Sequence, residues 1–107
     1  MTLAEFVTVA KLGELEEGKG KKIAINNGQE LALFKISGKV YAIQENCPHQ
    51  GGPLSDGEVE GTVVMCPWHG MTYDLTTGKA APEAWNHDFN VKTYNVKVEG
   101  DNVMVEI

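Results

Sequence analysis

The fold of this chain is decided by two short stretches, Cys47-Pro48-His49 and Cys66-Pro67-Trp68-His69. Each stretch pairs a thiol with an imidazole, and together they contain both cysteines and two of the three histidines of the chain. Thiolate and neutral imidazole are the protein ligands that bind zinc, copper and iron–sulfur clusters. The pattern therefore predicts a metal centre built by two loops, with the four ligands Cys47, His49, Cys66 and His69.

Two other interpretations of the same residues compete with a redox centre. A disulfide between Cys47 and Cys66 would leave the histidines unexplained, and disulfides are rare in the cytoplasm. A structural zinc site is the second alternative. Common zinc sites pair like ligands, Cys with Cys and His with His, whereas each loop here supplies one of each kind. The mixed pairs favour a centre in which two sulfurs and two nitrogens bind different metal ions.

Around the two stretches, from Glu45 to Pro82, the chain is rich in residues that break regular structure. The glycines and prolines of this region are Gly51, Gly52, Gly57, Gly61, Gly70, Gly78, Pro48, Pro53, Pro67 and Pro82. Strand-like runs are short in the same region. The composition predicts a loop-rich subdomain over residues 45–82, inserted between β-hairpins of a single domain.

Outside this region, short β-rich runs are separated by Gly, Asn and Asp, which is typical of antiparallel sandwiches and barrels. Residues 21–25 and 30–36 flank an Asn-Gly pair, and this arrangement predicts a hairpin. A second turn leads into residues 40–43. Near the end, two alternating runs predict two further strands, each with one buried face; their apolar residues are Tyr94, Val96, Val98, Val103, Val105 and Ile107. The predicted class is all-β.

Length and charge limit the possible functions. A chain of 107 residues and 11.7 kDa corresponds to one domain, residues 1–107. Its net charge of −6 would repel nucleic acid and anionic membranes, so neither is an expected partner. The N-terminal residues lack a basic segment followed by an apolar run, and no stretch approaches the roughly 20 apolar residues of a membrane helix. We expect a cytoplasmic protein.

A resemblance sharpens the metal prediction. The chain carries Cys-Pro-His-Gln-Gly-Gly-Pro-Leu from Cys47 and Cys-Pro-Trp-His-Gly from Cys66, and these motifs resemble the cluster-binding motif of Rieske proteins. The whole chain resembles the small Rieske ferredoxins of bacterial ring-hydroxylating oxygenases. The resemblance implies a Rieske-like antiparallel β-barrel or sandwich and one [2Fe–2S] cluster per chain. It assigns Cys47 and Cys66 to the buried iron, and His49 and His69 to the outer iron.

The resemblance also implies a role and partners. With both irons fully coordinated, no metal position is open to a substrate, so we expect an electron carrier and not an enzyme. The implied donor is a flavin-dependent ferredoxin reductase, and the implied acceptor is a terminal Rieske non-haem iron oxygenase, both bound transiently. A second hypothesis is the small Rieske-like subunit of an assimilatory nitrite reductase. A third is a binding module stabilised by zinc.

The chain departs from respiratory Rieske proteins in two respects. Gly52 and Trp68 stand where those proteins have two further cysteines, so no bridging disulfide is expected. Met71 stands where they have a serine that donates a hydrogen bond at the cluster. Losing that donor favours the lower part of the Rieske potential range of roughly −150 to +300 mV. Tyr73 has two interpretations, as a donor to a cysteine sulfur or as a core aromatic.

Overall fold

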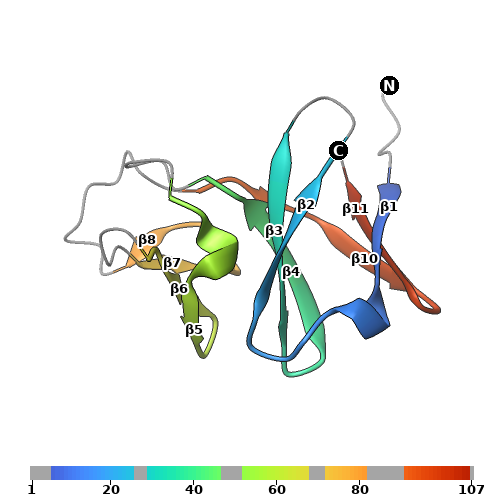
Figure 1. Cartoon of the computed structure of the whole chain (residues 1–107), viewed down its shortest axis with the longest axis horizontal. Helices are drawn as coiled ribbons and strands as arrows, with labels where there is room; N and C mark the ends of the chain where they lie inside the picture. The colour runs from blue at the N-terminus through green and yellow to red at the C-terminus, as the bar shows by residue number, and fades with distance from the viewer. Residues whose placement is uncertain (1–5, 26–28, 47–51, 68–71, 82–90, 107) are drawn as a thin grey trace.

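The structure is a computed structural model, and it describes residues 6–25, 29–46, 52–67, 72–81 and 91–106. Within these ranges the regular elements are antiparallel β-strands and two short 3₁₀ turns, arranged in three sheets (Figure 1). The all-β prediction is confirmed. None of the helical elements in the described ranges is long enough to cross a membrane.

The first sheet joins the two ends of the described chain. Its strand order is β1-β11-β10, with β1 at Phe6–Lys11, β11 at Asn102–Glu106 and β10 at Val96–Glu99. The sequence pattern did not predict β1. Its pairing with β11 shifts register between Thr8 and Ala10, and such an irregularity disturbs the period of two that marks a strand. The turn η1 (Leu12–Glu14) follows β1.

The second sheet contains the longest strand. Its order is β2-β3-β4-β9, with β2 at Gly20–Ala24, β3 at Glu30–Ile36, β4 at Lys39–Gln44 and β9 at Thr93–Tyr94. The predicted β2–β3 hairpin is confirmed by its pairing, while its Asn-Gly turn lies outside the described residues. Between β3 and β4 the chain turns through Ser37 and Gly38, which both have positive φ. The carboxylate of Glu17 accepts hydrogen bonds from both of their backbone N–H groups.

Strand β3 is buried on both faces and separates two cores. Alternate side chains of a strand point to opposite faces, and all four residues from Leu31 to Phe34 are fully buried. Leu31 and Leu33 lie in the core between the first and second sheets, which also contains Val103 and Val105. Ala32 and Phe34 lie in a second core on the other face. The continuous apolar run of β3 follows from this double burial.

The third sheet is small and covers the second core. Its order is β5-β6-β7-β8, with β5 at Glu58–Glu60, β6 at Val63–Met65, β7 at Thr72–Asp74 and β8 at Ala80–Ala81. The turn η2 (Leu54–Asp56) precedes it. In Figure 1 this sheet lies at the left, beside the larger sheets. Its inner side chains Val64 and Tyr73 pack in one cluster with Phe34 and Ile43 of the second sheet.

The C-terminal region corrects one sequence prediction. The alternating run from Tyr94 to Val98 is divided between two strands, because β9 pairs with β4 and β10 pairs with β11. At the change of sheet, Asn95 donates through its side-chain amide to the carboxylate of Glu106 at 2.6 Å. The predicted burial of Val98 is wrong, since this side chain on the edge strand β10 is 43% exposed. Val103 and Val105 are buried as predicted, and Ile107 lies outside the described residues.

Candidate metal centre

Of the four predicted ligands, Cys66 alone lies in the part of the chain that the structure describes. It directly follows β6 and is 1% exposed, in the core that the third sheet covers. The other three predicted ligands, Cys47, His49 and His69, lie outside the described residues. The assignment of all four therefore stays a prediction, and the structure contributes the surroundings of Cys66 and the bases of both loops.

The second ligand loop is closed at its base by a pair of strands. β6 and β7 pair antiparallel, and the register places Met65 opposite Thr72 and Val64 opposite Tyr73. The two residues that flank positions 66–71, Met65 and Thr72, therefore lie opposite each other in the sheet. The pairing of Met65 with Thr72 therefore offsets the entropy cost of bringing the two ends of this loop together.

The first ligand loop is closed in a similar way. Asn46 and Pro53 form an isolated antiparallel bridge on either side of residues 47–52. One residue farther out, the backbone N–H of Leu54 donates to the carbonyl oxygen of Glu45 at 2.8 Å. The side-chain amide of Gln44 donates to the carbonyl oxygen of Asn46 at 2.7 Å. The two ends of this loop are thus fixed next to each other.

Both loop bases rest on the same core. Leu54, just after the first loop, is fully buried in the cluster that also contains Cys66 at the start of the second loop. Tyr73 belongs to this cluster and is fully buried, which agrees with its interpretation as a core aromatic. A hydrogen bond from its hydroxyl to a cysteine sulfur stays a prediction. The shared core brings together the bases of the two loops predicted to build one centre.

The donor set fits a metal cluster on chemical grounds. Among the described residues, Cys66 shares a buried hydrophobic cluster with Phe34, Leu54 and Leu75. A thiolate in such surroundings needs a compensating positive charge, which bound metal ions supply. Two thiolates neutralise the charge of +2 that a core of two ferric ions and two sulfides carries, so the oxidised site would be neutral. An all-cysteine site would carry −2 and would suit an apolar setting less well.

Sequence reasoning missed one residue next to the first loop. Glu45 is 2% exposed. Among the described residues, no other charged side chain is buried. Its carboxylate accepts hydrogen bonds from Ser55. No signal in the sequence indicated this, because glutamates at strand ends are usually exposed.

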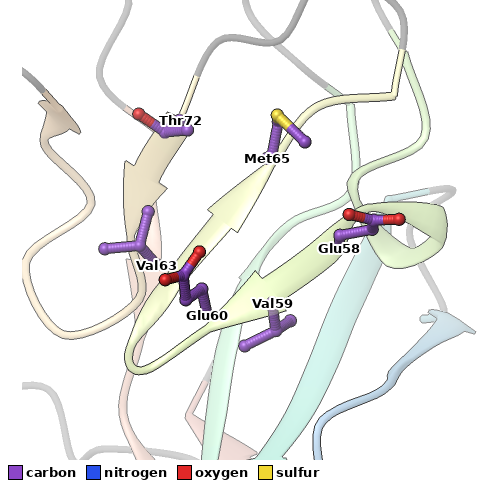
Figure 2. A pocket seen from close by; sticks show the side chains of 6 residues that line it. All are labelled: Glu58, Val59, Glu60, Val63, Met65 and Thr72. Atoms are coloured by element: carbon purple, nitrogen blue, oxygen red, sulfur yellow. The ribbon is translucent and has the colours of Figure 1, made fainter.

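The outer face of the third sheet carries negative charge beside the second loop. A shallow pocket of about 480 Å³ is lined there by Glu58, Val59, Glu60, Val63, Met65 and Thr72 (Figure 2). Glu58, Met65 and Thr72 follow one another across the sheet in register. Met65 and Thr72 are also the residues that close the second loop. This face would repel anionic small molecules and attract cationic surfaces.

The sequence of the chain matches a known protein family. The model of the Rieske [2Fe-2S] domain family matches residues 5–95. The ferredoxin component of the naphthalene 1,2-dioxygenase system from Pseudomonas aeruginosa is 36% identical over 105 residues, which cover 96% of each chain.

Solved structures agree on the fold. A ferredoxin of Sphingomonas yanoikuyae B1 superposes with a TM-score of 0.86 at 26% identity, covering 96% of this chain and 99% of that one. A structure named as the small subunit of an NADH-dependent nitrite reductase from Mycobacterium tuberculosis has a TM-score of 0.88 at 21% identity, covering 99% and 97%. This second likeness shows the fold alone.

Proposed function

We propose, from the premise that the chain belongs to the family of Rieske [2Fe–2S] domains, that it is the ferredoxin component of an oxygenase system. In this role it carries single electrons and is not itself an enzyme. The observation that carries the proposal is the similarity, over 96% of both chains, to a ferredoxin component of a dioxygenase system. The two closed loops over one core support it.

We assign one [2Fe–2S] cluster per chain to the four predicted ligands. Cys47 and Cys66 would hold one iron, and His49 and His69 the other. When bound, such a cluster supplies a one-electron redox couple. The burial of Cys66 supports its place on the inner iron. We further propose that residues 45–82 form the cluster-binding part of a single domain spanning residues 1–107.

The proposed partners are a flavin-dependent reductase as electron donor and a Rieske non-haem iron oxygenase as acceptor. Carrier complexes must dissociate quickly and usually bury less than about 1,200 Å². A chain with a net charge of −6 would bind such partners through cationic surfaces, and long-range attraction would speed their encounter. A cytoplasmic location stays a prediction from the sequence.

The nitrite reductase hypothesis rests on a likeness of fold. The high TM-score of that small subunit comes at 21% identity, so it carries no argument about activity. Co-purification separates the two roles, because a subunit would migrate in a fixed ratio with a large sirohaem protein. We expect the chain to migrate alone. A zinc-stabilised module would be colourless and would contain no iron.

The direct test is analysis of the anaerobically purified protein. We expect iron and acid-labile sulfide in equal amounts and, after reduction by dithionite, an electron paramagnetic resonance (EPR) signal of a Rieske centre. A purified flavin reductase with NADH should then reduce the protein, and a purified oxygenase should reoxidise it. Protein that contains zinc, or that neither partner reduces or oxidises, would contradict the proposal.

A further inference from the structure

Glu45 forms a clamp across the base of the first ligand loop. One carboxylate oxygen accepts the backbone N–H of Ser55 at 2.8 Å, and the other accepts the Ser55 hydroxyl at 2.7 Å. Both oxygens of this buried side chain therefore have a hydrogen-bond partner within the fold. The clamp spans the loop, since the two residues are ten positions apart.

The backbone of Glu45 adds a second set of bonds at the same point. Its N–H donates to the carbonyl oxygen of Glu30 in β3 at 3.2 Å, and its own carbonyl accepts the N–H of Leu54 at 2.8 Å. One residue thus joins the start of the loop, the end of the loop and the inner strand β3 of the second sheet. Moving Glu45 would move both ends of the loop relative to that sheet.

The other side of the clamp is held by close packing. A Cβ atom added to Gly20 in β2 would lie 2.5 Å from the carbonyl oxygen of Ser55 and 2.8 Å from its Cα. The backbone of β2 therefore contacts the backbone of Ser55 directly. Ser55 is held between this strand and the carboxylate of Glu45, which leaves the end of the loop little freedom.

We propose that Glu45 is a positioning residue, which through its clamp on Ser55 holds the first ligand loop in the geometry that binds the cluster. The proposal rests on the proposed function, because it takes Cys47 and His49 as ligands. Glu45 does not bind the metal in this account. It acts by fixing the two ends between which both of these ligands lie.

The test compares three variants of the cluster-containing protein. Ser55→Ala removes the hydroxyl of the clamp without changing a charge, and Glu45→Leu removes the whole clamp. Glu17→Leu is the control away from the loop, because the Glu17 carboxylate also accepts two hydrogen bonds, here from two backbone N–H groups at the β3–β4 turn. The measurements are the rate at which visible absorption is lost in the presence of an iron chelator and the EPR g values of the reduced protein.

We expect Glu45→Leu to release the cluster at least about tenfold faster than the wild type, and Ser55→Ala about fivefold faster, because both variants remove buried hydrogen bonds at the base of the loop. Both should shift the g values, and the shift in Ser55→Ala would report geometry because that variant keeps every charge. Glu17→Leu should keep the wild-type g values and release rate. If Glu45→Leu fails to fold, Ser55→Ala decides.

Two results would overturn the proposal while the electron-carrier function stands. The first is wild-type release rates and g values in both clamp variants. The second is an equal acceleration in Glu17→Leu, which would indicate general destabilisation. A wild-type protein without any cluster signal would instead overturn the proposed function, and the positioning role with it.

Discussion

The two large sheets and the small third sheet differ in how they are stabilised. The large sheets enclose a core of their own, to which strands from both contribute. The third sheet has strands of two or three residues, and its core includes Ala32, Phe34 and Ile43 of the second sheet. Short strands with so little apolar surface are not independently stable. The third sheet therefore depends on the larger sheets and on whatever its loops bind.

This difference assigns separate tasks to the two regions. The large sheets support the loop bases, because side chains of β3 and β4 pack against Leu54 and Cys66 in the second core. In the region of the predicted ligands, the strands that the structure describes have two or three residues, so contacts at the loop ends help to set its geometry. Local stability should differ accordingly, with the lowest values around the loops.

Removing the cluster should cause the largest change in the difference in local stability between the two regions. Cys66→Ser, or removal of iron by a chelator, is expected to loosen residues 45–72 far more than the large sheets, because binding of the metal contributes directly to the folding of these loops. Hydrogen exchange measured by mass spectrometry checks this. Equal loosening throughout the chain would contradict the division into two regions.

The second-largest effect is expected when a side chain is removed from the core that the two regions share. Phe34→Ala removes a fully buried ring from the shared core and should cost about 3–5 kcal/mol in the free energy of unfolding. Leu33→Ala, its neighbour on the opposite face, should cost about 2–5 kcal/mol. Denaturant unfolding gives both values.

The location of the damage distinguishes these two variants. Hydrogen exchange should rise mainly in the third sheet for Phe34→Ala and mainly in β10 and β11 for Leu33→Ala. The same exchange pattern in both variants would show that the two cores are one cooperative unit.

A smaller effect is expected where β2 touches the turn after the first loop. Gly20→Ala would place a methyl group against the backbone of Ser55 and should cost about 1–3 kcal/mol by overpacking. Gly13→Ala is the matched control, because a Cβ added at Gly13 meets nothing within 4 Å. Urea unfolding of both variants measures the difference. Equal stability of the two would mean that η2 shifts freely on β2.

The smallest effect is a gain at the far end of the second sheet. Ser37 has a φ of 51°, a conformation that asparagine tolerates better than serine. Ser37→Asn should therefore raise the free energy of unfolding by about 0.5 kcal/mol, as judged from the strain of the left-handed region. The cluster signals should not change. A loss of stability would argue against strain at this turn.

Much of the fold could be predicted because its signals are local. The apolar run of β3, the turn at Ser37 and the alternation at Val103 each lie within a few residues of the feature they predict. β1 was not predicted, because its register shifts between Thr8 and Ala10 and the shift disturbs the alternation that marks a strand. The division of the run into β9 and β10 at Asn95 was not predicted, because a strand that changes sheet keeps its alternation of polar and apolar residues.

The candidate centre shows the same limit. The spacing of Cys66 and the other predicted ligands is visible in the sequence, whereas the closure of the loops depends on partners that are distant along the chain. Glu45 could not be selected in advance, because its burial results from the turn that brings Ser55 back to it.

Protein-film voltammetry on the anaerobically purified protein tests the central claim most directly. The account predicts a reversible one-electron wave in the lower part of the range of roughly −150 to +300 mV. A film that shows no wave at any potential in this range, from protein shown to be folded, would contradict the electron-carrier function.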